Sequence, residues 1–246
     1  LKLEQDLFAS IKNNELVLYY QPKISALDGR VIGSEALIRW QHPVHGLIPP
    51  DDFISMAEQT GLIQPLTEWV LNKALEDYSK CKYTSKALNI SVNLSAINLR
   101  DERISLTIAS ALDKWSVPPE ALTLELTESS IMSDPEFAVS ILTKLDAMGV
   151  TLSIDDFGTG HSSLAYVKEL PVDEIKIDKS FIIGIKQDSN NEAIVRAVLV
   201  LAHHMNLSVV AEGVEKVEAG ALNNIAPTVL QLMGVEKPAE MDHALI

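Results

Sequence analysis

Two adjacent carboxylates, Asp155 and Asp156, follow a short apolar run at residues 151–154 and precede a glycine-rich turn at residues 157–160. The apolar run predicts a buried strand, in which successive side chains point to opposite faces. A sharp turn directly after this strand could bring both carboxylates toward one spot. Two carboxylates at a buried strand end are unfavourable unless a cation or a proton lies between them. The alternative is a surface turn in which each Asp caps a backbone amide.

The same arrangement recurs along the chain, because most of the predicted strands end in a carboxylate, an amide or an amine. In a parallel α/β barrel, the strand ends and the loops that follow them form the rim that carries the active site. We therefore expect these side chains to meet at one rim. They are Glu35 with Arg39, Asn93, Glu125 with Glu128, Asp155 with Asp156, Lys176 with Asp178, Glu212 with Glu215, and Gln231.

Oxygen donors of this kind suit Mg²⁺ or Mn²⁺. The sequence has no Cys and His cluster with zinc spacing, and we do not expect its histidines to bind metal. Any single carboxylate is more simply explained as a helix cap or a surface charge. Repeated placement at the ends of apolar strands favours a shared site.

Lys176 alternates with Ile175 and Ile177 in the run EIKID. Since the two isoleucines should face the helices, Lys176 should point into the barrel. A buried lysine is unfavourable unless carboxylates surround it. Its role would be to balance the charge of an acidic centre, to hold a water beside the metals, or both.

The composition limits the class of protein. A chain of 246 residues with 47% hydrophobic residues can fill the core of one α/β barrel and is not disordered. The net charge of −14 argues against duplex nucleic acid as a partner, although metal ions could still admit a small anionic ligand. The single cysteine, Cys81, allows no intrachain disulfide, which fits a reducing compartment.

No signal peptide and no apolar run long enough to cross a membrane is present. We therefore expect a cytoplasmic domain with no membrane contact of its own, either free or as the cytoplasmic part of a membrane-anchored protein. Since the chain starts at Leu1 and shows no linker, we expect residues 1–246 to be one domain of a longer protein.

Strands and helices alternate after an initial hairpin. An amphipathic helix is expected over the first dozen residues, then a strand at 16–21 stopped by Pro22, and an antiparallel strand at 31–40 after the Asp28-Gly29 turn. About eight strands favour closure into a barrel, with an open doubly wound sheet as the alternative. The further strands are expected at 87–94, 122–126, 151–154, 174–177, 207–211 and 228–230, and the further helices at 51–58, 65–78, 101–115, 135–148, 191–205 and 216–224.

Six ordered motifs resemble those of bacterial EAL domains, a family of cyclic di-GMP phosphodiesterases. The resemblance covers essentially the whole chain and implies a TIM-type (β/α)8 barrel with the first strand antiparallel. The motifs are Glu35-Ala36-Leu37 followed by Arg39, SVNLS at 91–95, ELTE at 125–128, DDFGTG at 155–160, KID at 176–178 and AEGVE at 211–215.

The resemblance implies hydrolysis of one phosphodiester bond of cyclic di-GMP to linear pGpG with two Mg²⁺ or Mn²⁺ ions. Two metals held close together can stabilise both the attacking and the leaving oxygen. The implied roles are Glu35, Asn93, Glu125 and Asp155 on one metal, Asp155 bridging to a second metal that Asp156 helps to hold, Glu212 as ligand or general base, and Lys176 on the attacking water.

The resemblance also implies substrate contacts and an assembly. Arg39 would bind a phosphate oxygen, and Gln21 and Leu37 would line the substrate groove. Gln231 would bond a metal-bound water. The loop at 157–164 would couple metal binding to a homodimer contact, with Glu128 as its anchor and with Gly158 and Gly160 supplying its backbone freedom. Sensory or signalling domains are expected elsewhere in the full-length chain.

The C-terminal motif departs from the family pattern. Gln231 is followed by Leu232 and Met233, where family members usually have Gly and Tyr. Met233 offers no aromatic face, so we expect affinity for guanine to suffer more than the chemistry. Two other functions stay open. One is a receptor that binds cyclic di-GMP without cleaving it, and the other is a barrel enzyme of the enolase type, which also combines carboxylates with a lysine base.

Overall fold

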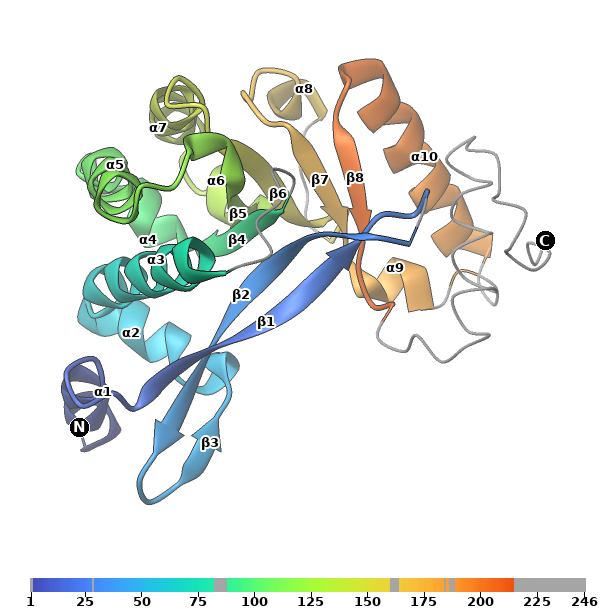
Figure 1. The fold of residues 1–246 in the computed structure, drawn as a ribbon. Helices are drawn as coiled ribbons and strands as arrows, with labels where there is room; N and C mark the ends of the chain where they lie inside the picture. The colour runs from blue at the N-terminus through green and yellow to red at the C-terminus, as the bar shows by residue number, and fades with distance from the viewer. Residues whose placement is uncertain are drawn as a thin grey trace.

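The computed structural model describes residues 2–27, 29–81, 88–159, 164–183, 185 and 189–214. Within these residues, eight strands form one curled sheet in the order β1-β2-β4-β5-β6-β7-β8, with β3 paired to β2 (Figure 1). Neighbours from β2 and β4 through β8 are parallel, whereas β1 and β3 are antiparallel to β2. The strands are β1 Leu16–Ile24, β2 Val31–His42, β3 Gly46–Ile48, β4 Asn89–Leu94, β5 Leu122–Thr127, β6 Thr151–Phe157, β7 Glu174–Ile177 and β8 Ser208–Ala211.

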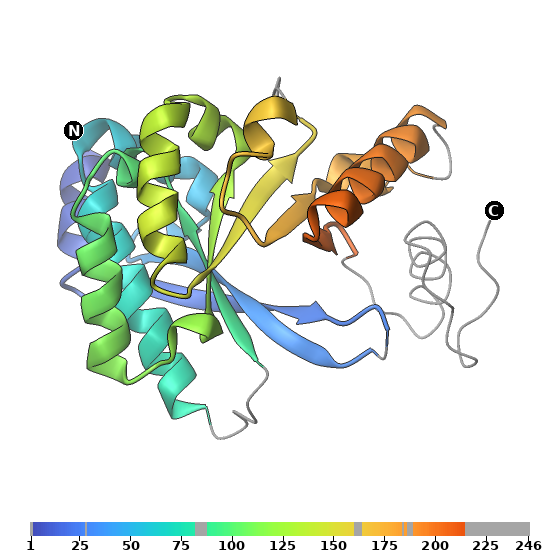
Figure 2. The same cartoon turned by 90° about the horizontal axis from the view of Figure 1, so that it is seen from above.

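The larger helices pack on the outer face of this sheet, as Figure 2 shows for α3, α5 and α7. In the part of the chain that the structure describes, no helix is both long enough and apolar enough to cross a membrane. The helices are α1 Lys2–Ser10, α2 Ile54–Thr60, α3 Ile63–Lys80, α4 Ala96–Leu99, α5 Ile104–Trp115, α6 Glu128–Met132, α7 Pro135–Asp146, α8 Leu164–Val167, α9 Lys179–Ile183 and α10 Ser189–Met205, with short 3-10 turns η1 Pro50–Asp52 and η2 Pro119–Ala121.

Alternation along the strands divides apolar from polar side chains. In β5, Leu124 and Leu126 belong to the apolar core, while Glu125 between them contacts interior lysines. In β7, Ile175 and Ile177 belong to the same core, and Lys176 is only 2% exposed. Since successive strand residues point to opposite faces, the outer face packs on the helices and the inner face carries the charged groups.

Most expected elements are confirmed, with small differences at their ends. The β1–β2 hairpin has the expected antiparallel pairing, with Gln21 opposite Glu35. The predicted stop at Pro22 is wrong, because β1 continues to Ile24 with Pro22 opposite Ser34. Among the described strands β1 pairs only with β2, so the missing N–H of a proline interrupts no second ladder.

The short strand β3 was not expected from the sequence. A tight turn after His42, the last residue of β2, leads into β3, which pairs with β2. His42 Nδ1 accepts hydrogen bonds from the backbone N–H groups of Val44 and His45, which closes that turn. The predicted helix at 216–224 and strand at 228–230 lie outside the described residues, and so does the closure expected from that strand.

Candidate metal centre and active site

Lys176 lies at the centre of a cluster of carboxylates on the inner face of the sheet. Its Nζ is 2.6 Å from Glu125 Oε2, 2.8 Å from Glu212 Oε1, 3.0 Å from Asp155 Oδ2 and 3.3 Å from Glu35 Oε2. Burial alone would lower the pKa of Lys176, but these carboxylates raise it well above its ordinary value. The lysine therefore stays charged at neutral pH, and the expected inward orientation is confirmed.

Glu35 on β2 and Asn93 on β4 meet across the same face. Asn93 Nδ2 donates a hydrogen bond to Glu35 Oε1 at 2.8 Å. Because Asn93 donates through its nitrogen, its carbonyl oxygen is the atom that remains suited to a cation. Burial, with the charge of Glu125, raises the pKa of Glu35 in spite of the nearby Lys176.

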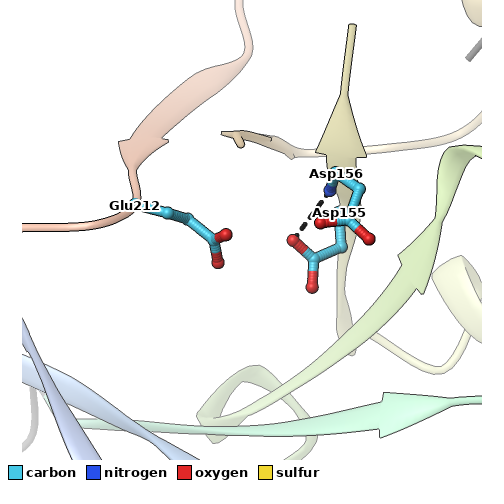
Figure 3. Close-up of side chains that lie close together, drawn as sticks. All are labelled: Asp155, Asp156 and Glu212. Carbon is cyan, nitrogen blue, oxygen red and sulfur yellow. Dashed lines mark hydrogen bonds between the residues drawn. The ribbon is translucent and has the colours of Figure 1, made fainter. Parts of the chain in front are cut away.

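Asp155 and Asp156 converge through a bulge in β6 rather than through a turn after the strand. The pairing of β6 with β7 shifts register between Ile154 and Phe157, and Asp156 has a left-handed φ of +54°. The Asp156 N–H donates to Asp155 Oδ1 at 2.8 Å (Figure 3). A left-handed conformation in a residue other than glycine costs about 1–3 kcal/mol, and such strain gathers at functional sites.

Glu212, directly after β8, completes this group. Asp155, Asp156 and Glu212 each offer a carboxylate oxygen, and these atoms lie within 4.8 Å of one another (Figure 3). Burial is the largest cause that raises the pKa of Asp156 and of Glu212, with neighbouring carboxylates adding to it. We call Glu35, Asp156 and Glu212 the raised-pKa carboxylates. The predicted convergence of strand-end carboxylates is thus confirmed for this group.

The loop after β6 is tied to the start of α6. Glu128, only 3% exposed, accepts a hydrogen bond through Oε2 from the Gly158 N–H at 2.9 Å. Gly158 has a φ of +97°, and a Cβ there would lie 3.2 Å from Phe181 Cε2. Only glycine adopts this conformation without strain. Gly160 lies outside the described residues.

The predicted substrate-binding residues of the hairpin share the face of Glu35. Gln21 is opposite Glu35, Leu37 is opposite Tyr19, and Arg39 lies two residues beyond Leu37 on the same face. Arg39 donates to the Ile38 carbonyl at 2.8 Å, and its guanidinium lies 5.7 Å from the centre of the Tyr19 ring. Tyr19 was not anticipated, although the hairpin register places it on this face. Gln231 lies outside the described residues.

Sequence reasoning also missed a second interior lysine. Lys23 Nζ is 2.8 Å from Glu125 Oε1 and 3.2 Å from Glu174 Oε1. Burial lowers the pKa of Lys23, but the two glutamates raise it by more, so the pKa lies above its ordinary value. Burial raises the pKa of Glu125, but Lys176 and Lys23 together hold it below its usual range. Extending the hairpin register two residues past Gln21 would have revealed Lys23.

The donor set fits a hard divalent cation. The side chains that converge offer carboxylate oxygens and one amide oxygen, which are ligands that Mg²⁺ and Mn²⁺ prefer. Lys176 already balances four of these carboxylates with a single positive charge. The negative charge that remains can therefore hold a divalent cation.

Comparison with known proteins agrees with this geometry. The model of the EAL domain family matches residues 4–223. The chain is 45% identical over 244 residues to the bifunctional diguanylate cyclase/cyclic di-GMP phosphodiesterase MucR of Pseudomonas aeruginosa, covering 98% of this chain and 36% of MucR. It is 39% identical over 221 residues to the cyclic di-GMP phosphodiesterase PdeR of Escherichia coli, covering 90% of this chain and 33% of PdeR.

A solved structure described as the PaMucR phosphodiesterase in complex with c-di-GMP superposes with a TM-score of 0.86 at 44% identity, covering 96% of this chain and 93% of that one. The fold is therefore the TIM-like barrel of these structures, with its first strand antiparallel, and the chain belongs to the EAL domain family. The chain spans 36% and 33% of the lengths of the two named curated relatives, MucR and PdeR.

Proposed function

We propose that this domain hydrolyses one phosphodiester bond of cyclic di-GMP to give linear pGpG, with two Mg²⁺ or Mn²⁺ ions at the carboxylate rim. The observation that carries the proposal is the convergence of Asp155, Asp156 and Glu212 within 4.8 Å, beside a lysine that is already shared among four carboxylates. The names of the relatives MucR and PdeR supply the substrate.

The charge balance of the interior supports divalent metal ions. In the part of the chain that the structure describes, carboxylates outnumber the ammonium groups they surround, so the ionised cluster carries a net negative charge that divalent cations would reduce. Unbalanced buried charge is strongly unfavourable, so such an excess of carboxylates indicates cation binding. The carboxylates are Glu35, Glu125, Asp155, Asp156, Glu174 and Glu212, and the ammonium groups are those of Lys23 and Lys176.

Glu35, Asn93, Glu125 and Asp155 would hold one ion, and Asp155 with Asp156 would hold the other, with Glu212 as a further ligand or a general base. When bound, such ions make a coordinated water acidic enough to act near neutral pH and neutralise charge at the phosphate. The bulge at Asp156 supports this division, because it brings two consecutive side chains to one point.

The remaining roles belong to side chains of the chain itself. Lys176 is charged and donates hydrogen bonds at the centre of the rim, so it would orient the attacking water. Arg39 presents a planar guanidinium on the face of Glu35, and this group would bind a phosphate oxygen. Gln21 and Leu37 would line the groove beside it. The Gly158 N–H donates a hydrogen bond to Glu128, which ties the loop after β6 to the start of α6. This contact supports the proposal that the loop responds to metal binding.

Incubating the purified domain with cyclic di-GMP and Mg²⁺ or Mn²⁺, followed by chromatography of the nucleotides, tests the proposal. We expect pGpG that disappears with EDTA and in the Glu35→Gln and Asp155→Asn variants. Glu192→Gln makes the same change of charge in an exposed pair with Arg196 and should leave turnover unchanged. Full activity of Glu35→Gln and Asp155→Asn would refute the site.

A receptor is the second candidate, because the run after Gln231 lacks the family's Gly-Tyr pair. Nucleotide retained on the protein without product in either metal would favour it. The homodimer, the use of two Mg²⁺ or Mn²⁺ ions, a cytoplasmic location and signalling domains elsewhere in the full-length chain stay predictions.

A further inference from the structure

Lys23 reaches the interior of the barrel from the far end of β1. Gln21 and Lys23 lie on the same face of the strand, and Lys23 is opposite Gly33, which has no side chain to fill the interior beside it. The Lys23 side chain is 12% exposed. Its ammonium group therefore needs carboxylate partners.

Those partners form a chain of contacts that leads from the cluster toward the amino-terminal end of β7. Lys23 Nζ lies 2.8 Å from Glu125 Oε1 and 3.2 Å from Glu174 Oε1. Ser153 Oγ donates a hydrogen bond to the same Glu174 oxygen at 2.9 Å. Lys23 is thus held by Glu174, and Glu174 by Ser153.

Glu125 depends on Lys23 for the position of one oxygen. The Glu125 side chain is fully buried, with Oε2 at 2.6 Å from Lys176 and Oε1 at 2.8 Å from Lys23. No well-aligned hydrogen bond reaches Oε1 from the described residues, so the ion pair with Lys23 is the polar contact that holds it. Without Lys23, only the contact of Oε2 with Lys176 would orient the carboxylate among the described residues.

We propose that Lys23 is a positioning residue of the metal centre. By holding Oε1 of Glu125 away from the rim, it keeps Oε2 directed toward the cluster around Lys176, where the proposed ions bind. Glu174 and Ser153 support Lys23 in turn. This role rests on the proposed function, since it requires a metal at Glu125.

The direction of the effect separates positioning from simple electrostatics. Removing one positive charge near a cation site should by itself strengthen cation binding. Removing a group that orients a ligand weakens it, typically by about 10–100-fold for partners of metal ligands. We therefore expect Lys23→Met, which keeps most of the length of the side chain but removes the ammonium group, to bind Mn²⁺ about 10–100-fold more weakly.

Calorimetric titration of the metal-free domain with Mn²⁺ tests this without any measurement of turnover. Lys23→Arg keeps the charge and should recover most of the affinity, whereas Glu174→Gln should weaken binding less than Lys23→Met does. Lys73→Met is the matched control, because Lys73 also bridges two carboxylates, Glu76 and Asp77, but on the surface of α3. Its affinity should equal that of the unsubstituted domain.

Unchanged or tighter Mn²⁺ binding by Lys23→Met would overturn the positioning role and leave the proposed function standing. Failure of the unsubstituted domain to bind Mn²⁺ would refute the metal centre, and this role with it. If circular dichroism shows that Lys23→Met does not fold, Ser153→Ala decides the question, because it removes the hydrogen bond that supports Glu174 without changing any charge. Weaker binding by that variant supports the role, and unchanged binding refutes it.

Discussion

Replacing Lys176 by Met should destabilise the metal-free domain by about 3–5 kcal/mol at pH 8. The ammonium group contacts four carboxylates at 2.6 to 3.3 Å and is 2% exposed. At an effective dielectric constant of about 20, one such pair is worth roughly 5 kcal/mol before desolvation. The net loss is smaller than the sum of four pairs, because carboxylates that lose their partner can take up protons.

The loss of stability in Lys176→Met should depend on pH and on bound metal. Lys176 has a raised pKa and is charged throughout pH 5–8, so the pH dependence comes from its partners. At pH 5 the orphaned carboxylates can be protonated, and the loss should be smaller than at pH 8. Saturating Mn²⁺ should restore part of the stability, because it supplies the missing positive charge.

Thermal unfolding followed by circular dichroism, in EDTA and in Mn²⁺, measures the effect. For a chain of this size, a loss of 3–5 kcal/mol corresponds to a fall in Tm of about 6–20 °C. Lys73→Met removes an exposed lysine and should lose less than about 1 kcal/mol. A Lys176→Met variant as stable as the unsubstituted domain in EDTA at pH 8, or a loss that Mn²⁺ leaves unchanged, would refute the argument.

Three further predictions concern pH and the loop after β6. The raised-pKa carboxylates bind more protons in the folded than in the unfolded domain. The free energy of unfolding in EDTA should therefore fall as the pH rises above about 4.5. Bound Mn²⁺ should abolish this fall. Urea titrations from pH 4.5 to 8 measure this, and a steady rise in EDTA would contradict it. Gly158→Ala should lose about 1–3 kcal/mol or more in urea, because strain at φ +97° adds to the contact with Phe181. Gly46→Ala, at φ +72° with open space around its Cβ, should lose less, and equal losses would remove Phe181 from the explanation. Glu128→Gln should weaken the hydrogen bond from Gly158 by about 1 kcal/mol and speed exchange of that amide severalfold. Unchanged exchange, measured by NMR, would show that the anchor lies elsewhere.

Alternation along buried strands was enough to place the centre of the site. Lys176 between Ile175 and Ile177, and Glu125 between Leu124 and Leu126, could only point inward once their neighbours packed on helices. The pattern therefore predicted that Lys176 lies on the inner face of the sheet, and Glu125 follows the same alternation. The order of the motifs supplied the family, and the roles assigned to single residues beyond these contacts stay predictions.

What the sequence could not show were irregular backbone positions. Proline usually ends a strand, but Pro22 is tolerated because β1 has a single neighbour among the described strands. Since the strand was expected to stop at Pro22, Lys23 beyond it was not considered. The bulge at Asp156 depends on a left-handed residue that no hydrophobic period reveals. Both misses fall beside the carboxylates, where side-chain interactions override local preference.

The central lysine has a consequence for cation selectivity. An ion that enters the rim meets carboxylates already neutralised in part by an ammonium group, which it must displace or share. A monovalent ion brings no more charge than that resident group and gains little by replacing it. A divalent ion brings twice the charge and can outweigh the contacts of Lys176 with Glu125, Glu212, Asp155 and Glu35. On this charge argument, sodium and potassium should bind weakly at the rim, and Lys176 should stabilise the acidic interior of the metal-free domain.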